Sequence, residues 1–386
     1  MGSCTKSATL SIDDPIEIEN ISFGVNNHYI LRNSIPFIIK GVVYVPGYPG
    51  YLPWEIENST SLPNDLKNSI STDLSNIKAM GANTIRFWGT PKYCYEALKN
   101  GEDLYFIQTI WIKGDEPDFQ NMVFKENTKT YIKEVIDRIY SVFNDETPPI
   151  IAFIIGNELS DSSILSTNAA HPNITSFSGN YIVTDSNITA TEAFIAEMAD
   201  FTRTYEFNTY ENKSLLSYAN EIRTADIIDI SFLDFISHNA YSNAVPYYRP
   251  NTASGSSSGT LFQGWVEEVK SKHPNKPLLI TETGLSVSPN AFHVGPPNFG
   301  YGGNTELEQT TGLLQNISDI NTSKLPSAGV CIHEYLDAWW KFGLEDSYSQ
   351  DPNDIEEWFG LVKLKKLGEW YTTENRDSYN ALKNIW

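Results

Sequence analysis

Cysteine, histidine and long apolar runs are all scarce in this chain of 386 residues. The three cysteines, Cys4, Cys94 and Cys331, are spaced in a way that gives neither a disulfide framework nor a metal-binding motif. The six histidines are scattered, so we expect no metal and no cofactor. No apolar run reaches the roughly 18 residues that a membrane-spanning helix needs, so no transmembrane segment is predicted.

Basic residues are also few, with 27 Lys and Arg against 48 Asp and Glu and a net charge of −21. Such an acidic surface repels phosphate backbones, so nucleic acid is not an expected partner. A Gly-rich phosphate loop is missing as well. The segment after the first predicted strand, residues 46–50, reads Pro-Gly-Tyr-Pro-Gly, which forms two turns and not a phosphate cradle. This argues against a doubly wound open sheet.

Aromatic residues, in contrast, are abundant, at 13% of the chain with nine Trp and 21 Tyr. They could pack a core or, because flat rings stack on the C–H faces of pyranoses, they could bind sugars. Composition alone does not choose between these roles. Hydrophobic residues make up 40% of the chain, which is enough for a sizeable core.

The start of the chain differs in character from the rest. Residues 1–20 are predicted to be a flexible polar tail, and residues 21–386 a single catalytic domain. Met1-Gly2-Ser3 resembles a vector-derived remnant and is followed by Cys4, which would fit a lipoprotein whose signal peptide has been removed. An ordinary N-terminal tail is the alternative. We predict an extracytoplasmic location, with Cys4 as the candidate lipid anchor.

The hydrophobic pattern after the tail predicts a regular succession of elements. Two alternating runs, 21–25 and 29–32, are separated by Asn26-Asn27 and predict a β-hairpin. Beyond it, apolar runs of strand type alternate with segments of helical period. The predicted strands are 37–45, 84–88, 104–112, 150–155, 214–218, 235–238, 278–281 and 329–335. The predicted helices are 64–80, 92–99, 125–143, 190–211, 222–228, 261–272, 306–320 and 379–385.

Eight apolar strands separated by helices predict an α/β fold, a closed (β/α)8 TIM barrel with an N-terminal β-hairpin. A bare barrel needs about 250 residues. The excess falls mainly in segments 46–63, 160–189, 284–305 and 341–375. Each of these follows a strand and precedes a helix, which places it on the C-terminal face of the barrel, where active sites lie.

Two predicted strand ends carry a carboxylate. The fourth strand runs into Asn157-Glu158, and the seventh ends at Glu282. These strands lie across the barrel mouth from each other, so both carboxylates can face one cavity. One such residue would be weak evidence, because charged strand ends are common. The pair is stronger evidence, because glycoside hydrolysis needs one acid and one carboxylate on either side of the scissile bond.

Asn-Glu after strand four, with a second Glu at the end of strand seven, resembles the retaining glycoside hydrolases of clan A. This clan includes β-galactosidases, β-glucuronidases, cellulase-type endoglucanases and yeast-type β-1,3-glucanosyltransferases. The resemblance spans about residues 24–386, and the segments 26–45, 81–88, 239–241, 358–362 and 379–383 also resemble these enzymes. It implies that Glu158 is the general acid/base and Glu282 the nucleophile.

The resemblance also implies roles for the neighbours of this pair. Asn157 would bind the 2-hydroxyl of the sugar at the cleavage site. Arg86 from strand two and Tyr241 from strand six would contact the nucleophile. Each has an ordinary alternative, because Arg86 could pair with a core acid and Tyr241 could be a wall aromatic. From strand six, Asn239 is a candidate substrate-binding residue, and His238 either orients a catalytic residue or is a satisfied core histidine.

Aromatic residues near the strand ends are candidates for sugar binding. Trp339 and Trp340 follow strand eight, where the clan usually places an aromatic platform under the sugar. Trp88 could line a neighbouring subsite or belong to the core. Aromatic residues of the long loops could stack an acceptor sugar, namely Tyr48, Tyr51, Trp54, Phe299, Tyr301 and Trp358.

We therefore expect a retaining glycoside hydrolase that acts on a β-linked glucan or glucooligosaccharide through a covalent glycosyl-enzyme. The expected partner is a β-linked oligo- or polysaccharide. A β-glucan transglycosylase shares the first step, and differs in that a sugar hydroxyl and not water resolves the intermediate. A non-catalytic carbohydrate-binding barrel would keep the fold and the aromatic residues, but it would not need both Glu158 and Glu282.

Overall fold

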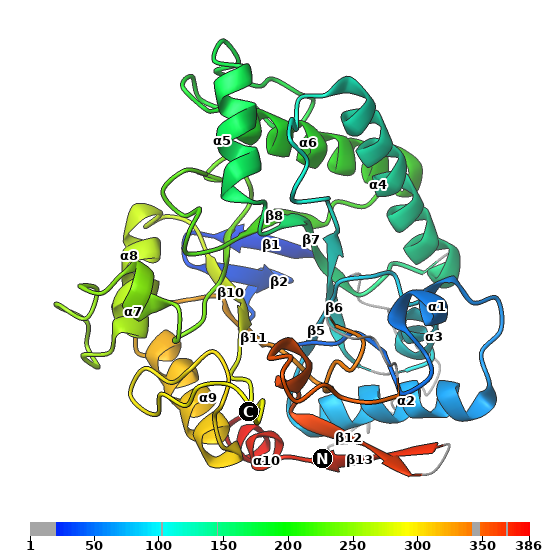
Figure 1. The fold of residues 1–386 in the computed structure, drawn as a ribbon. Helices are drawn as coiled ribbons and strands as arrows, with labels where there is room; N and C mark the ends of the chain where they lie inside the picture. Colours follow the sequence, from blue (N-terminus) through cyan, green and yellow to red (C-terminus); the bar gives the residue numbers. More distant parts are fainter. Residues whose placement is uncertain (1–20, 102, 145, 342–347, 368–369) are drawn as a thin grey trace, which may run out of the picture.

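The computed structural model describes residues 21–101, 103–144, 146–341, 348–367 and 370–386. The predicted tail, with Cys4, lies outside these residues. Eight parallel strands close into a barrel, which confirms the predicted fold class (Figure 1). In barrel order they are β4 (Ile39–Val43), β5 (Thr84–Phe87), β6 (Tyr105–Ile110), β7 (Ile150–Asn157), β8 (Leu215–Asn220), β9 (Ile236–Asn239), β10 (Leu278–Thr283) and β11 (Gly329–Ile332).

Side chains alternate along these strands between the barrel interior and its outer surface. In β4, Val43 belongs to the interior cluster of buried residues and its neighbour Val42 to the outer cluster. In β6, Ile107 faces inward and Phe106 outward in the same way. Both faces are therefore apolar, which explains why the strands read as continuous hydrophobic runs in the sequence.

Helices pack on the outer surface of the barrel. The main ones are α2 (Asn64–Ala79), α3 (Lys92–Lys99), α4 (Met122–Phe143), α6 (Ala190–Tyr210), α8 (Leu261–Lys272), α9 (Glu306–Asn321) and α10 (Asp377–Ile385). Capping boxes start α6, with Thr189 and Glu192, and α9, with Thr305 and Glu308. No described helix combines the length and the apolar character that crossing a bilayer requires.

The helix predicted at 222–228 is wrong, because these residues form turns after β8. The Asn220 side chain closes the connection: it accepts a hydrogen bond from Thr224 Oγ1 at 2.5 Å and donates one to the Ile228 carbonyl at 3.3 Å. Side-chain bonds of this kind compete with helix formation in short polar segments. The connection carries Glu221 and Arg223, whose charges both act on Glu158.

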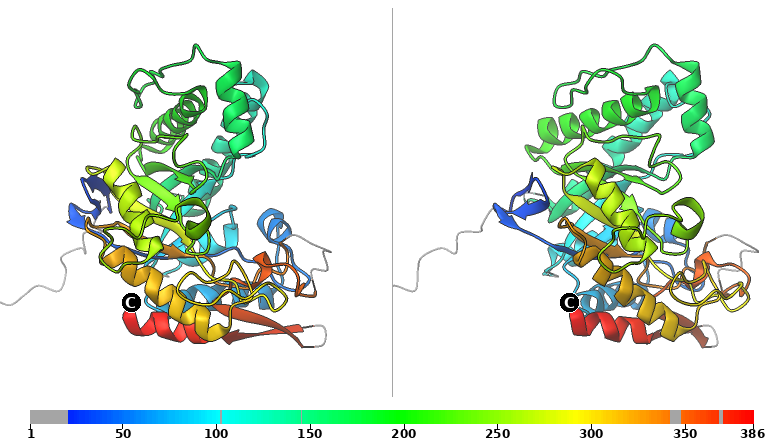
Figure 2. Two further views of the ribbon diagram at one scale, coloured as in Figure 1. Left: turned by 60° about the vertical axis from the view of Figure 1, so that its left-hand side comes forward. Right: turned by 90° about the vertical axis from the view of Figure 1, so that its left-hand side faces the viewer.

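The N-terminal hairpin is confirmed, with β1 (Phe23–Asn26) paired to β2 (Tyr29–Arg32) and a short third strand, β3 (Ile35–Pro36). Ile30 is fully buried and belongs to the interior cluster. Phe23 and Phe37 contact the Tyr105 ring, at the start of β6, with centroid distances of 5.2 and 5.3 Å. The hairpin therefore lies against the N-terminal end of the barrel, opposite the long loops (Figure 2).

Three of the four long predicted loops contain regular structure. Segment 46–63 holds α1 (Pro53–Asn58), and segment 160–189 holds α5 (Asp161–Ala170). Segment 341–375 contains the antiparallel pair β12 (Val362–Leu367) and β13 (Trp370–Asn375). A further short helix, α7 (Val245–Tyr248), follows β9. These additions build up the face of the barrel that carries the predicted catalytic residues.

A buried ion pair ties the C-terminal segment to this face. Arg376, just before α10, donates from Nη1 and Nη2 to the two carboxylate oxygens of Asp337 at 2.7 and 2.8 Å. The Gly360 N–H also donates to Asp337 Oδ1, at 3.1 Å. The exposed fractions of the Arg376 and Asp337 side chains are 2% and 1%. Both Asp337 oxygens thus have donors, whereas the buried Arg376 Nε has no hydrogen-bond partner among the described residues, and removing either member of so deep a pair would leave an uncompensated charge.

Candidate active site

Glu158 directly follows β7, at a kinked strand end. The backbone φ angles are 84° at Gly156 and 47° at Glu158, both in the left-handed region. Glycine adopts this region freely, whereas glutamate is strained there. The Glu158 N–H donates to the Ala219 carbonyl of β8 at 3.0 Å, which holds the strand end in place. The side chain is directed toward β9, where Asn239 Nδ2 donates to Glu158 Oε1 at 2.8 Å.

Glu282 reaches the barrel mouth because β10 departs from regular pairing. Leu279 lies in the interior cluster and Ile280 in the outer one, so strict alternation would place Glu282 on the outside. The pairing register shifts after Ile280, both against β9 and against β11. Such a bulge redirects the side chain that follows it. As a result Glu282 contacts side chains from β5 and from the end of β9.

Two donors bind the Glu282 carboxylate, one on each oxygen. Arg86 Nη1 donates to Oε1 at 2.6 Å, and the Tyr241 hydroxyl donates to Oε2 at 2.8 Å. The exposed fractions of the Arg86 and Glu282 side chains are 0% and 5%. In such a poorly solvated position, a cation and a phenol donor stabilise the charged form of the carboxylate.

Two asparagines join the two carboxylates into one network. Asn157 Oδ1 accepts from Arg86 Nη2 at 2.7 Å and from Asn239 Nδ2 at 3.1 Å. Asn239 also donates to Glu158, so a chain of hydrogen bonds runs from Glu282 through Arg86 to Glu158. The carbonyl oxygen of Asn157 is used by this chain, which leaves its NH₂ group for a substrate.

The surroundings of Glu158 favour its neutral form. Burial raises the pKa of Glu158 to about 8, and the charge of Glu282 adds to the rise. The hydrogen bond from Asn239 lowers the pKa without cancelling these effects. Near neutral pH Glu158 therefore holds a proton, while the donors on Glu282 stabilise a negative charge. Chemistry that needs an acid and a nucleophile requires this arrangement, in which a protonated carboxyl group lies beside one whose negative charge is stabilised.

A second buried charged cluster, which the sequence pattern did not predict, lies near this pair. The Lys341 ammonium donates to Glu334 Oε1 at 2.7 Å, lies 3.4 Å from Glu356 Oε2 and 3.1 Å from His333 Nε2. Burial holds the pKa of His333 well below its usual value, so its ring is neutral. Glu356 opens the short 3₁₀ helix η1 (Glu356–Trp358), and burial followed by the charge of Glu282 raises its pKa to about 7.

The predicted site aromatics are divided between the active site and the core. The Trp88 ring stacks on His333 at 5.4 Å, and His333 meets Tyr241 edge-on at 6.1 Å, so Trp88 is linked to the surroundings of Glu282. Trp340 lines a cleft at the barrel mouth, together with Trp88, Lys341 and Glu356. Trp339 is 7% exposed and belongs to the core cluster.

His238 packs on the outer side of the barrel, away from the carboxylate pair. Its ring meets Trp265 edge-on at 5.8 Å, and burial lowers its pKa to about 3. Two of the loop aromatics predicted to stack an acceptor sugar are also buried, since Tyr48 is 3% and Phe299 6% exposed. Tyr48 donates to Asp73 at 2.6 Å, which fixes it inside the fold.

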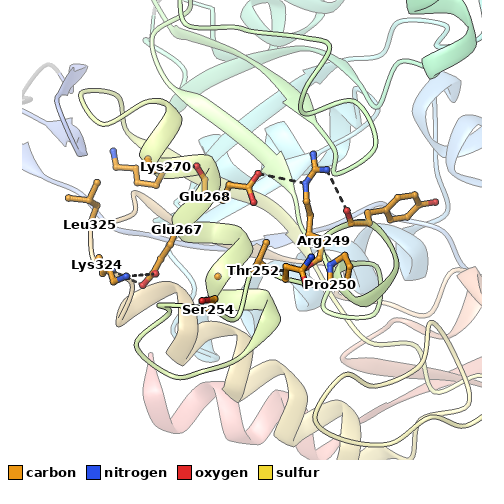
Figure 3. Close-up of a pocket in the computed structure, with 13 residues that line it drawn as sticks. Arg249, Pro250, Thr252, Ser254, Glu267, Glu268, Lys270, Lys324 and Leu325 are labelled. Carbon is orange, nitrogen blue, oxygen red and sulfur yellow. Dashed lines mark hydrogen bonds and ion pairs between the residues drawn. The ribbon is translucent and has the colours of Figure 1, made fainter.

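A second large cavity, of about 640 Å³, lies between α8 and the loop before it (Figure 3). Four of its charged side chains form ion pairs, Arg249 with Glu268 at 3.8 Å and Lys324 with Glu267 at 3.4 Å, while the Lys270 ammonium donates to the Lys276 carbonyl. Neither Glu158 nor Glu282 lines it. Its two carboxylates, Glu267 and Glu268, are each paired with a cation, so this cavity does not offer the neutral acid beside a second carboxyl group that the barrel mouth has.

Neither a scan against protein-family models nor a search of curated proteins finds a match. Solved structures do match. A GH2 β-galacturonidase from Eisenbergiella tayi bound to galacturonate has a TM-score of 0.60 and 17% identity, over 94% of this chain and 53% of that one. The β-glucuronidase of Ruminococcus gnavus has a TM-score of 0.62 and 14% identity, over 95% and 53%.

A β-glucuronidase from an uncultured Clostridium species is similar to the same degree, with a TM-score of 0.63 and 15% identity, over 95% of this chain and 53% of that one. The chain thus spans about half the length of these enzymes. At such low identity the similarity establishes the barrel fold, and the function has to be argued from the site itself.

Proposed function

We propose that this chain is a retaining β-glycosidase in which Glu282 is the nucleophile and Glu158 the general acid/base. The observation that carries the proposal is the hydrogen-bond network of the barrel mouth. It binds both oxygens of Glu282 with donors, and it holds Glu158 close enough for the charge of Glu282 to raise its pKa. A carbohydrate-binding barrel would gain nothing from this separation of charge states.

In the first step, a Glu282 oxygen attacks the anomeric carbon of the sugar while the bond to the leaving oxygen breaks. Glu158 transfers its proton to that leaving oxygen and becomes a carboxylate. Arg86 and Tyr241 hold Glu282 in position for the attack. The product of this step is a glycosyl ester of Glu282.

In the second step, the Glu158 carboxylate removes a proton from a water molecule, which attacks the same anomeric carbon. The ester bond breaks, Glu282 recovers its charge and Glu158 recovers its proton. Two displacements at one carbon give net retention. A sugar hydroxyl in the place of water would give transglycosylation, so the same residues serve either outcome.

We propose a β-linked glucan or glucooligosaccharide as the substrate, on the resemblance to glucan-active clan A enzymes. The names of the structural neighbours suggest uronides as the alternative. A uronate would need a cation to bind its carboxylate. In the described part of the site the cations already have carboxylate partners: Arg86 pairs with Glu282, Lys341 with Glu334, and Arg223 with Glu221. This favours a neutral sugar.

The test is a panel of aryl β-glycosides and β-linked glucans, with the anomeric form of the first product followed by NMR. We expect cleavage of neutral β-glucosides with retention, and loss of activity in Glu282→Gln. An inverted product would refute the double displacement. Activity confined to β-glucuronides or β-galactosides would refute the glucan assignment while leaving the mechanism intact. Longer products at high oligosaccharide concentration would identify transglycosylation.

A further inference from the structure

A cleft of about 390 Å³ opens at the barrel mouth, next to the cluster around Lys341. It lies over the β4, β5, β6 and β11 side of the mouth, and its walls include Trp54, Trp88, Trp111 and Trp340, with Lys341 and Glu356. Its volume falls within the range of about 300–1,000 Å³ that is typical of small-molecule sites. The proposed reaction uses none of the four tryptophans, so the cleft needs a separate explanation.

The tryptophans form two contacting pairs. The Trp54 and Trp340 rings meet at 6.4 Å, and the Trp88 and Trp111 rings at 5.6 Å. Trp54 is 51% exposed and Trp111 is 47% exposed. Large aromatic surfaces left open in a concave site mark a binding surface more often than they mark packing. An indole face fits the C–H face of a pyranose ring, so a sugar is a suitable occupant.

The polar groups of the cleft suit hydroxyl groups and not an anion. Lys341 is paired with Glu334 and Glu356, and its ammonium also lies 5.0 Å above the Trp88 ring. Glu57, on the opposite wall, is 3.3 Å from Arg138. Lys341 is thus shared by two carboxylates, and Glu57 already has a cation as its partner. Neutral hydroxyls can share such hydrogen bonds, whereas a further carboxylate would find no unpaired cation among the described residues of the cleft and would be repelled by Glu356 and Glu57.

The contacts of the cleft show which side of the scissile bond it serves. Trp88 stacks on His333, His333 contacts Tyr241, and Tyr241 donates to Glu282, so the cleft adjoins the nucleophile. The surroundings of Glu158 come instead from β9 and from the connection after β8, which carries Glu221 and Arg223. The leaving group must lie beside Glu158, because Glu158 protonates its oxygen. The cleft therefore lies on the glycone side.

From these contacts we propose that the tryptophan cleft binds the neutral sugar joined to the non-reducing side of the residue that is cleaved. The enzyme would then act on chains with at least two sugars before the scissile bond, in preference to removing single terminal residues. This inference rests on the proposed function and adds a specificity to it. Binding energy from the second sugar would be used to accelerate cleavage of a bond one residue away.

The experiment compares 4-nitrophenyl β-glucoside with the 4-nitrophenyl β-glycosides of cellobiose and laminaribiose. We expect kcat/KM for the better disaccharide glycoside to exceed that of the monosaccharide glycoside at least tenfold, with the intact disaccharide as the co-product. Trp54→Ala and Trp111→Ala should each lower that ratio at least fivefold. Tyr247→Ala, which removes a side chain that is 79% exposed and does not line the cleft, is the matched control and should leave the ratio unchanged.

A measurement of disaccharide binding tests the cleft as a sugar site independently of glycosidase activity. In Glu282→Gln, cellobiose or laminaribiose should quench tryptophan fluorescence, and adding Trp54→Ala should weaken that binding at least fivefold. Equal kcat/KM for mono- and disaccharide glycosides would overturn the inference while leaving the glycosidase assignment in place, as would release of a single glucose before nitrophenol. If no aryl glycoside is cleaved, the proposed function fails. Disaccharide binding that depends on Trp54 would still support the cleft as a sugar site.

Discussion

Two buried arginine–carboxylate pairs on the same face of the barrel have very different surroundings. Arg376 binds Asp337 through two parallel hydrogen bonds, and the Gly360 N–H completes the shell of the carboxylate. Arg86 binds Glu282 through only one oxygen, and the other oxygen takes its donor from Tyr241. The Asp337 carboxylate is buried, and both of its oxygens accept hydrogen bonds from within the fold. The Glu282 carboxylate faces the mouth beside another carboxyl group.

The comparison shows that burial and pairing do not by themselves make a carboxylate catalytic. Both pairs are nearly inaccessible to solvent, so their desolvation is similar. What differs is that the Asp337 pair links α10 to the loop after β11, whereas hydrogen bonds link the Glu282 pair to Glu158, the proposed proton donor. Substitutions in the Asp337 pair should therefore lower mainly the free energy of unfolding, and substitutions in the Glu282 pair mainly the turnover.

The largest expected effect is that of Glu282→Gln on turnover. Because the glycosyl ester cannot form, kcat should fall at least about 10⁴-fold, in the range that loss of a nucleophile produces in other enzymes. The amide oxygen can still accept from Arg86, and its NH₂ group can donate to the Tyr241 hydroxyl, but the buried Arg86 charge loses its partner, so kcat has to be expressed per folded molecule. Steady-state kinetics give kcat, and calorimetry gives the folded fraction. Residual activity above one per cent would contradict the role of Glu282.

Glu158→Ala should have an effect that depends on the leaving group. Loss of general acid catalysis should lower kcat about 10²–10⁴-fold for glucans, whose leaving groups need a proton. For aryl glycosides with acidic leaving groups the first step should be much less affected. Azide should then restore turnover and yield a β-glycosyl azide. The same loss for every leaving group, with no azide product, would contradict the assignment of the two roles.

Asp337→Ala should act on stability and not on chemistry. Removing one partner leaves the Arg376 charge buried and unpaired, which should cost about 3–5 kcal/mol of unfolding free energy. Urea denaturation gives the change, and active-site titration with a slow aryl glycoside gives kcat per folded molecule. Lys78→Ala is the control, because its pair with Asp103 is exposed and should contribute about 1 kcal/mol or less. A large fall in kcat per folded Asp337→Ala molecule would remove the contrast between the pairs.

Tyr241→Phe should have a smaller effect on turnover. The substitution removes one hydrogen bond to a charged group, worth about 1.5–3 kcal/mol, so kcat/KM should fall about ten- to one-hundredfold. Tyr205→Phe is a matched control, because the Tyr205 hydroxyl also donates to a carboxylate, that of Asp137, in the outer helix layer. If both variants lose activity equally, Tyr241 has no special part in positioning the nucleophile.

The smallest effect is the pH dependence near neutrality. As the proposed general acid, Glu158 would act in its protonated form, and its pKa is raised to about 8, so around neutral pH kcat/KM should stay level below that value and decline above it. Each further pH unit should lower it about tenfold. The alkaline decline should disappear in Glu158→Ala when an aryl glycoside with a good leaving group is the substrate. A decline beginning near pH 5 would mean that Glu158 is ionised in the free enzyme.

The barrel could be predicted from the sequence because each strand is apolar on both faces and the turns between elements are polar. The prediction failed where side-chain bonds replaced helical ones, as at Asn220 and Thr224. It also missed α5, whose residues lack a clear apolar face although Ser160 caps it by accepting from the Ser163 N–H. Short polar helices of this type depend on their caps more than on periodicity.

The candidate site was predictable as far as it follows the strand ends. A closed barrel brings the ends of its strands together. Five site residues belong to strands or follow them directly, namely Arg86, Asn157, Glu158, Asn239 and Glu282. The cluster around Lys341 was not found: Glu334 lies within the predicted eighth strand, but Lys341 and Glu356 reach it from the connection after β11, which has no periodic signal in the sequence. Nor could the pattern of residues show that Trp339 is buried while Trp340 faces the cleft.

The left-handed backbone of Glu158 has a consequence for how this fold could be altered. A glutamate with a φ of 47° carries roughly 1–2 kcal/mol that glycine would not. Selection for thermal tolerance alone would thus favour replacing the residue that we propose as the proton donor. At this position the proposed catalytic role and the stability of the fold make opposite demands. Substitutions intended to raise the melting temperature should therefore be made elsewhere, for example at exposed apolar positions of α4 such as Met122, which is 78% exposed.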